Sequence, residues 1–419
     1  MRPSPPQNFR FLRLGWQWPE ALRAMRHPNF RLFFFGQLIS LSGTWMQSTA
    51  QQWLVYRLTN SQLSLGMVTF ASYIPVLLLS LFMGVVVDRF QRRRLLVITQ
   101  TWFMLLAAAL AVLTYLELVQ YWHILLLASL LGIANALDMP ARQAFYIDLV
   151  KREDLMNAIA LNSSIFNGAR IIGPAIGGLV IAAFGEAPAF ATNAVTYLAT
   201  IACLLMMRLP PFDPPASDKS SLSELKGGLD YLIANRHALS LVSMTALLSI
   251  FCFPYLVLLP VFARDILKIG AEGYGVLMAA QGSGALIGAL TLAAFGDNQS
   301  KSRLLLFSRG LLAVALAGLA LSATPILSIL ALVLAGYALI TQLAVTNTSL
   351  QLIVPDELRG RVMSTFTWAL GGFWPLGSLL IGALGDRFSA PNAVLLSAAL
   401  CTLLTVIGQL WFPKVNEVR

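Results

Sequence analysis

Three ionisable residues lie inside stretches of the sequence that are otherwise apolar. Arg170 lies in GARIIGPAIGG (168–178), and Asp138 and Arg142 lie in NALDMPARQ (135–143). Within a lipid bilayer a charged side chain costs about 2.5–3.5 kcal/mol, so each should face a partner or a water-filled cavity. Asp138 is the only acid well inside an apolar run, so we predict a buried charge network of these three residues. Asp138 could pair with either arginine: with Arg170, or with Arg142, which lies one helical turn away.

The stretch around the buried arginine also holds five residues that weaken a helix: Gly168, Gly173, Pro174, Gly177 and Gly178. Small residues allow helices to approach each other closely inside a membrane. A proline removes a backbone hydrogen bond and bends the helix. Two interpretations remain open, namely tight packing around a static kink, or a hinge and seal against a neighbouring helix.

Residues typical of enzymes or metal sites are few. The three histidines lie at the ends of apolar runs or between them, and the sequence has neither an H-E-x-x-H motif nor a phosphate-binding loop. The three cysteines fall within apolar runs and lack the spacing of a metal site. We therefore predict a protein that is not an enzyme, with no catalytic residues, no bound metal and no cofactor.

The elements that carry these residues are expected to be membrane-spanning helices. Of the 419 residues, 57% are hydrophobic and 11% are charged, whereas soluble domains carry about 25% charged residues. Apolar runs of roughly 20 residues, long enough to cross about 30 Å of hydrocarbon, recur along the chain. We predict an all-α membrane protein with twelve transmembrane helices, near residues 30–56, 64–87, 95–116, 122–146, 157–183, 187–207, 239–263, 273–296, 304–323, 325–350, 361–384 and 390–412.

The longest polar segment, 208–238, divides the apolar runs into six and six. It predicts a cytoplasmic linker between two six-helix bundles, 30–207 and 239–413. A polar cytoplasmic segment, 1–29, precedes the first bundle, and a short cytoplasmic tail, 414–419, follows the second.

The two halves also resemble each other in sequence. DRFQRRRLLV from Asp88 aligns without a gap on DNQSKSRLLL from Asp297. Duplicated six-helix units are a recognised plan for carriers, whose binding site lies at the midplane between the halves.

Basic residues are distributed unevenly about the predicted helices. The net charge is +10, and nearly all Lys and Arg residues, Arg309 included, fall on one side if the first residue lies in the cytoplasm. This asymmetry is the positive-inside rule. It predicts a multi-pass protein of the cell (inner or plasma) membrane with both termini in the cytoplasm. Because the lipid bilayer accounts for the basic charge, no nucleic-acid partner is expected.

The segment GVVVDRFQRRR lies between the second and third apolar runs. Five of its residues resemble the signature of the major facilitator superfamily of secondary transporters: Gly84, Asp88, Arg89, Arg92 and Arg93. The resemblance implies a gating motif, in which Asp88 sits against the N-terminal end of the eleventh helix, near Gly360–Arg361. There the carboxylate would meet the positive end of the helix dipole and hold the inner gate shut when the transporter faces outward.

The glycine-rich stretch 168–178 is similar to an exporter-associated motif of the same superfamily, with one extra residue after the first glycine. Together with DMPAR (138–142) it resembles the branch that includes the enterobactin exporter and macrolide-type efflux pumps. The resemblance implies export of small amphipathic molecules, drug-like or siderophore-like, by alternating access. We expect proton-coupled antiport by a monomer, with Asp138 as the candidate proton carrier. An uptake permease or lipid flippase of the same fold and, more distantly, a membrane signalling protein without transport remain alternatives.

Polar and aromatic residues on otherwise apolar helices predict the walls of a roomy, weakly polar cavity between the bundles. Such a cavity suits an amphipathic organic molecule better than a sugar phosphate or an inorganic ion. For each residue alone, hydrogen bonding or packing between helices is the alternative explanation. The candidates are Gln47, Gln51, Asn135, Asn167, Phe251, Tyr255, Gln281, Tyr337, Gln342, Trp368 and Trp374.

Overall fold

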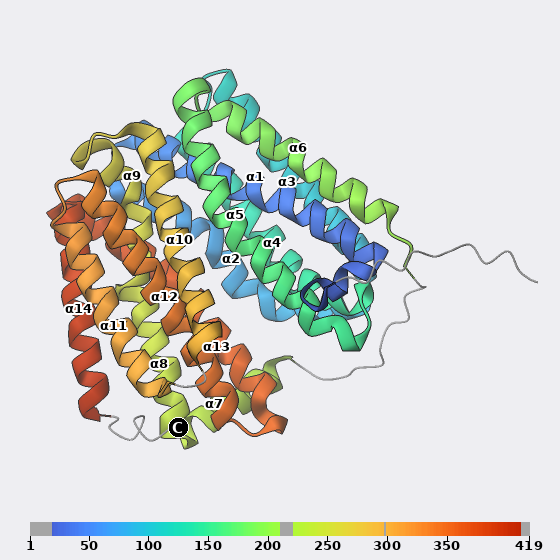
Figure 1. The fold of residues 1–419 in the computed structure, drawn as a ribbon. Coiled ribbons are helices and arrows are strands. Elements are labelled where there is room, and N and C mark those ends of the chain that lie inside the picture. Colours follow the sequence, from blue (N-terminus) through green and yellow to red (C-terminus); the bar gives the residue numbers. More distant parts are fainter. Residues whose placement is uncertain (1–18, 210–220, 297–298, 412–419) are drawn as a thin grey trace, which may run out of the picture.

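The computed structural model describes residues 19–209, 221–296 and 299–411 (Figure 1). Within these ranges the chain is helical, and no strand occurs. Most of the predicted N-terminal segment, the whole of the predicted tail 414–419 and Asp297 of the sequence repeat lie outside the described residues.

The first half is built from long helices that pack side by side. α1 packs against α5 and α6, α2 against α4, and α3 against α4 and α6. η1 and η2 are short 3₁₀ helices. The elements are η1 (Glu20–Arg26), α1 (Pro28–Thr59), α2 (Gln62–Arg89), α3 (Arg92–Tyr115), α4 (Tyr121–Leu149), η2 (Arg152–Asp154), α5 (Leu155–Phe184) and α6 (Glu186–Met206).

The second half repeats this kind of packing. α10 and α11 both pack against α12, α11 also packs against α14, and α13 packs against α8. The elements are α7 (Ser221–Ala234), α8 (Arg236–Phe251), η3 (Phe253–Leu258), α9 (Leu259–Val261), η4 (Phe262–Ile266), α10 (Gly270–Phe295), α11 (Lys301–Ala320), α12 (Pro325–Ile353), α13 (Asp356–Phe388) and α14 (Ala390–Trp411).

In the described ranges, eleven helical segments are long and apolar enough to cross a membrane, judged by length and composition. The remaining predicted span is α1, which is 32 residues long. Its apolar character is lowered by polar residues such as Gln37, Ser40 and Gln47, all of which are buried against other helices. The predicted all-α membrane fold is therefore confirmed.

Two predicted segments differ in detail from the structure. The span expected at 239–263 is not one regular helix, because α8 ends before Pro254 and the chain continues through η3, α9 and the π-helical turn η4. Pro254 and Pro260 lack a backbone N–H donor, which explains the change of helix type. The predicted linker contains α7, which packs against α13.

The two ends of the molecule differ in how closely the halves approach. We call the end that holds the turn between α2 and α3, from Phe90 to Gln91, the basic end. The other end, with the turn at Asn60–Ser61, is called the opposite end. At the opposite end α2 packs against α13, and α5 packs against α10. Towards the basic end, where α7 lies, the halves diverge (Figure 1).

Candidate functional site

The buried acid of the first half forms an ion pair on its own helix. Asp138, on α4, is 3% exposed. Its Oδ2 accepts hydrogen bonds from the Arg142 guanidinium, at 3.0 Å from Nε and 2.5 Å from the nearer terminal nitrogen. Its Oδ1 accepts from Thr99 Oγ1 at 2.6 Å and from Gln100 Nε2 at 3.0 Å, both on α3. The structure thus selects Arg142, the rival partner, and places the pair inside the first half.

Arg170 lies elsewhere, between the two halves. From α5 its guanidinium donates a hydrogen bond to Gln281 Oε1 on α10 at 2.8 Å, and it lies 5.8 Å from the centre of the Trp45 ring on α1. No ion pair joins it to an acid in the described ranges. The predicted network of three residues is therefore wrong for Arg170. The physical reason is that its side chain bonds to α10, whereas Asp138 bonds within α4 and to α3.

Two tyrosines complete the surroundings of this arginine. Tyr73, on α2, and Tyr255, on η3, lie close enough to Arg170 to feel its charge. The site therefore draws residues from α1, α2, α5, η3 and α10.

The glycine-rich stretch supports close helix contacts on two sides of α5. A Cβ atom added at Gly173 would lie 2.7 Å from the carbonyl oxygen of Ser42 on α1, and one at Gly178 would lie 2.7 Å from that of Ala271 on α10. Gly177 also faces α1, while a Cβ at Gly168 would meet nothing within 4 Å.

Pro174 lies within α5, which continues as a helix through it. A Cβ atom at Gly275 of α10 would lie 2.5 Å from the Pro174 carbonyl oxygen. Large side chains are therefore excluded where α5 crosses α10. Whether this crossing also acts as a hinge stays a prediction.

Some of the predicted cavity residues lie inside one half rather than between the halves. Gln47 is buried and accepts a hydrogen bond from Asn193 Nδ2 on α6 at 2.7 Å. Gln342 is buried among hydrogen-bonding partners on α11 and α12. The Tyr337 hydroxyl accepts from Thr291 Oγ1 on α10 at 3.2 Å. Each of these polar groups bonds to a helix of its own half in this structure, so their place in the cavity wall stays a prediction.

The other predicted cavity residues have more varied surroundings. Tyr255 and Gln281 are fully buried beside Arg170. Phe251 and Trp374 are half-buried, and the Trp374 ring lies 6.4 Å from that of Phe253. The partly exposed candidates are Gln51, Asn135, Asn167 and Trp368.

At the basic end, Asp88 is exposed and makes no hydrogen bond or ion pair within the part of the chain that the structure describes. A Cβ atom added at Gly84, or at Gly360 of α13, would meet nothing within 4 Å. Arg361 lies instead against the glycines of α7. The predicted contact of Asp88 with α13 is thus not formed in this conformation, and its role in an outward-facing state stays a prediction.

The arginines of the gating motif bind within the first half. Arg92 pairs with Asp148 at the end of α4, with 2.7 Å between nitrogen and oxygen. Arg93 donates to the carbonyl oxygen of Met207 at 2.8 Å. Arg89 is exposed. These contacts hold the turn between α2 and α3 against its own bundle.

At the opposite end, an acid of the second half binds the beginning of α2. Asp386 of α13 accepts hydrogen bonds from Ser61 Oγ at 2.6 Å, from the Gln62 N–H at 2.6 Å and from the Leu63 N–H at 3.1 Å. A carboxylate is favoured there because the first N–H groups of a helix are unpaired and its dipole is positive. Sequence reasoning missed this contact, although Gly382 and Asp386 have the same spacing as Gly84 and Asp88.

A second contact between the halves lies at the same end. The Tyr56 hydroxyl of α1 donates a hydrogen bond to Asp265 of η4. Arg264 donates to Asn60 Oδ1 at 2.9 Å, and its guanidinium lies 5.4 Å from the centre of the Tyr56 ring. These contacts join the end of α1 to the broken segment of the second half.

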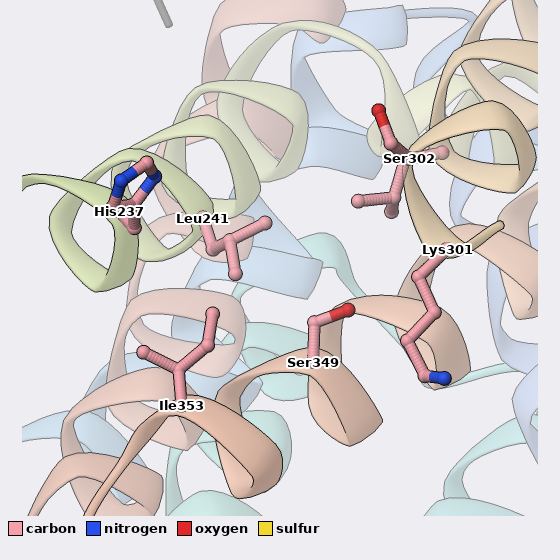
Figure 2. A pocket seen from close by; sticks show the side chains of 7 residues that line it. His237, Leu241, Lys301, Ser302, Ser349 and Ile353 are labelled. Atoms are coloured by element: carbon pink, nitrogen blue, oxygen red, sulfur yellow. The ribbon is translucent and has the colours of Figure 1, made fainter. Parts of the chain in front are cut away.

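A small pocket occurs at the basic end of the second half. Figure 2 shows His237 and Leu241 of α8, Lys301 and Ser302 of α11, and Ser349 and Ile353 of α12 around it. None of these residues was predicted to line the cavity, and the pocket lies within one half. It therefore does not belong to the candidate site.

Comparison with known proteins places the chain among transporters. A sequence profile described as "Transmembrane secretion effector" matches residues 20–418. The chain is 30% identical to the staphyloferrin A transporter of Staphylococcus aureus, over 85% of this chain and 90% of that protein. It is 29% identical to the multidrug efflux pump Tap of Mycolicibacterium fortuitum, over 92% of this chain and 96% of that protein. It is 28% identical to the enterobactin exporter EntS of Shigella flexneri, over 94% of this chain and 93% of that protein.

The fold agrees with solved transporter structures. A crystal structure of the nucleoside transporter NupG, as its D323A mutant, superposes with a TM-score of 0.77, at 15% identity and over 92% of this chain and 100% of that one. The sequence resemblance to the major facilitator superfamily is thus confirmed, as is the prediction that the protein is not an enzyme. The chain belongs to the transmembrane secretion effector family of major facilitator superfamily transporters.

Proposed function

We propose that the protein exports small amphipathic organic molecules across the cell membrane by alternating access, and that this structure is its inward-facing state. The observation that carries the proposal is the position of the contacts between the halves. In the described residues, the inter-half hydrogen bonds lie at the opposite end, through Tyr56, Asp386 and Arg264, and in the middle, through Arg170. At the basic end, a Cβ atom added at Gly84 or at Gly360 would meet nothing within 4 Å.

The orientation follows from charge. The basic end carries Arg92–Arg94 at the start of α3 and Arg152 at the start of η2, and the positive-inside rule assigns such an end to the cytoplasm. Both termini then lie in the cytoplasm. The cavity lies between the bundles 30–207 and 239–413 and opens to the cytoplasm. Export of cargo taken from the cytoplasm requires such a state. The chain alone supplies both bundles, so we propose that it works as a monomer.

The nature of the cargo is suggested by the walls of the site and by the relatives. Trp45, Tyr73 and Tyr255 surround Arg170, so aromatic faces dominate around one charge. Relatives named as siderophore transporters and as a multidrug efflux pump support an organic molecule rather than an inorganic ion.

Export is tested with inside-out membrane vesicles from cells that produce the protein. Vesicles energised so that their lumen becomes acidic should accumulate members of a panel of neutral, cationic and anionic fluorescent dyes, above the level in vesicles lacking the protein. Accumulation only in right-side-out vesicles would instead indicate uptake. No directional movement of any dye would remove the proposal.

We further propose that protons drive export and that Asp138 carries them. Asp138 is buried and paired with Arg142, and a rearrangement of the bundle that separates this pair would expose the carboxylate to a proton. In proteoliposomes, Asp138→Asn should abolish substrate-driven proton movement measured with a pH-sensitive dye. Arg309→Gln, in the polar cluster around Gln342 of the second half, should retain substrate-driven proton movement. Unchanged proton movement in Asp138→Asn would place the coupling elsewhere.

A further inference from the structure

The guanidinium of Arg170 is a charge without a counter-charge. It lies midway along α5, and in the described ranges its hydrogen bond goes to the neutral Gln281 oxygen, with Tyr73 and Tyr255 nearby. A charge at this depth is costly, and a buried charge is normally paired or bound to a ligand. A guanidinium without an acidic partner among the described residues is therefore the feature that needs an explanation.

Two more polar groups that can donate hydrogen bonds lie beside the arginine. The Tyr255 hydroxyl and the Gln281 Nε2 atom are buried, and neither makes a hydrogen bond of good geometry within the described ranges. Both residues are 0% exposed, and their side chains lie close to each other. Buried polar groups rarely remain unpaired, so such groups point to a missing partner. Arg170, Tyr255 and Gln281 can each donate a hydrogen bond, so a ligand group that accepts hydrogen bonds fits this place.

The site is open on one side. Tyr73, which lies near Arg170, is 46% exposed. Phe166, one turn of α5 nearer the basic end than Arg170, is 44% exposed, and its ring meets Trp45 edge-on with 5.7 Å between ring centres. Partly exposed aromatic side chains therefore lie next to the guanidinium on the side nearer the basic end.

We propose that Arg170, with Tyr255 and Gln281, binds a carboxylate group of the transported molecule, so that the cargo is an amphipathic organic acid. This inference rests on the proposed transport function, whose cargo it narrows. A guanidinium matches the two oxygens of a carboxylate, and charge-assisted hydrogen bonds are about twice as strong as neutral ones. The aromatic side chains would hold the apolar part of the same molecule.

A second buried arginine provides a matched comparison. Arg309 of α11 also donates to a glutamine oxygen, Gln342 Oε1, at 3.2 Å. It lies inside the second half, where a Cβ atom at Gly408 of α14 would be 3.5 Å from its guanidinium. Arg309 thus shares the chemistry of Arg170 but not its place between the halves, and it should not affect cargo binding.

The test uses two probes that differ only in their acidic group, 1-naphthylacetate and 1-naphthylacetamide. Each is titrated by calorimetry into the purified full-length protein in lipid nanodiscs. The wild-type protein should bind the acid about tenfold or more tightly than the amide, as expected for one added charge-assisted contact. Arg170→Gln should remove this preference by weakening only the acid. Arg170→Lys should keep part of it, because the positive charge remains. Arg309→Gln should keep all of it.

Equal affinities for the two probes, no saturable binding of the acid, or a preference that survives in Arg170→Gln would each overturn the inference. Thermal unfolding of each variant shows whether it is folded, and the amide affinity of Arg170→Gln serves as an internal check. The binding test does not depend on the direction of transport. Directional dye movement in vesicles without any acid preference would leave the export proposal standing and remove only this inference.

Discussion

The two ends of the α2–α13 pair have similar sequences but different contacts. Each helix ends in a glycine, three residues, an acid and an arginine: Gly84 to Arg89 on α2 and Gly382 to Arg387 on α13. At the opposite end, Asp386 binds the first N–H groups of α2. At the basic end, Asp88 is exposed and without a partner among the described residues.

This difference shows what such a pattern can do. An acid that ends one helix can bind the positive start of its antiparallel neighbour, provided that a glycine nearby lets the two backbones approach. Only one of the two ends makes this contact in the present state. The same helix pair therefore has a closed end and an open end, and substitutions at equivalent positions should have unequal effects.

These effects can be measured with spin labels at exposed sites, in a chain whose cysteines Cys203, Cys252 and Cys401 have been replaced. Leu118 and Ile326, 60% and 72% exposed, report the distance between the halves at the opposite end. Met156 and Leu352, 76% and 62% exposed, report it at the basic end. Each pair is labelled in a separate protein.

The largest change in the distance between the halves at the opposite end is expected for Gly382→Ala. A Cβ atom there would lie 2.6 Å from the carbonyl oxygen of Gln62, so the backbones of α2 and α13 must separate. Overpacking typically costs about 1–3 kcal/mol, which is roughly a 5- to 150-fold shift away from the closed opposite end. The Leu118–Ile326 distance should lengthen. Gly84→Ala is the control, since its Cβ would meet nothing, and an unchanged distance in Gly382→Ala would contradict the close packing.

A smaller shift towards the state with the opposite end open is expected for Asp386→Asn. Asparagine keeps the size of the side chain but loses the charge and one acceptor, and contacts of this kind are worth about 1 kcal/mol at an exposed helix start. The population with the opposite end open should rise about fivefold, and added salt should reduce the difference between wild type and variant. Asp356→Asn is the control, because Asp356 pairs with Arg359 on its own helix at 2.5 Å. Equal shifts in both variants would mean that the contact contributes nothing specific.

The fold could be predicted from the sequence because the features that define it are periodic and repeated. Runs of apolar residues set the helices, and the polar segment 208–238 set the division. α1 shows why composition alone is not sufficient: its polar residues, such as Gln37 and Gln47, are buried against other helices and lower its apolar character. The regular helix ends after α8 because prolines follow within the same apolar run. Hydropathy alone does not predict such a change of helix type.

The site was harder to predict, because an isolated polar residue in a helix does not reveal which neighbour it faces. Asp138 and its partner are one turn apart, so their pairing followed from local geometry. Arg170 depended on the packing of α5 against the other half, and no sequence feature fixed Gln281 as its partner. The second half has its own buried polar cluster, in which Gln342 accepts a hydrogen bond from Arg309. Arg309 therefore belongs inside a helix bundle and not among the cytoplasmic charges.

The smallest effect on this state is expected for Asp88→Asn. Because Asp88 has no partner here among the described residues, neither the Met156–Leu352 nor the Leu118–Ile326 distance should change in the resting protein. Transport should nevertheless fall, by about fivefold or more, if Asp88 stabilises the closed basic end through the start of α13 by about 1 kcal/mol. Expression should stay near normal, and Asp88→Glu, which keeps the charge, should retain more transport than Asp88→Asn. Wild-type transport in Asp88→Asn would mean that the free acid is only a surface charge, and that the similar sequences at the two ends of α2 and α13 do not reflect similar roles.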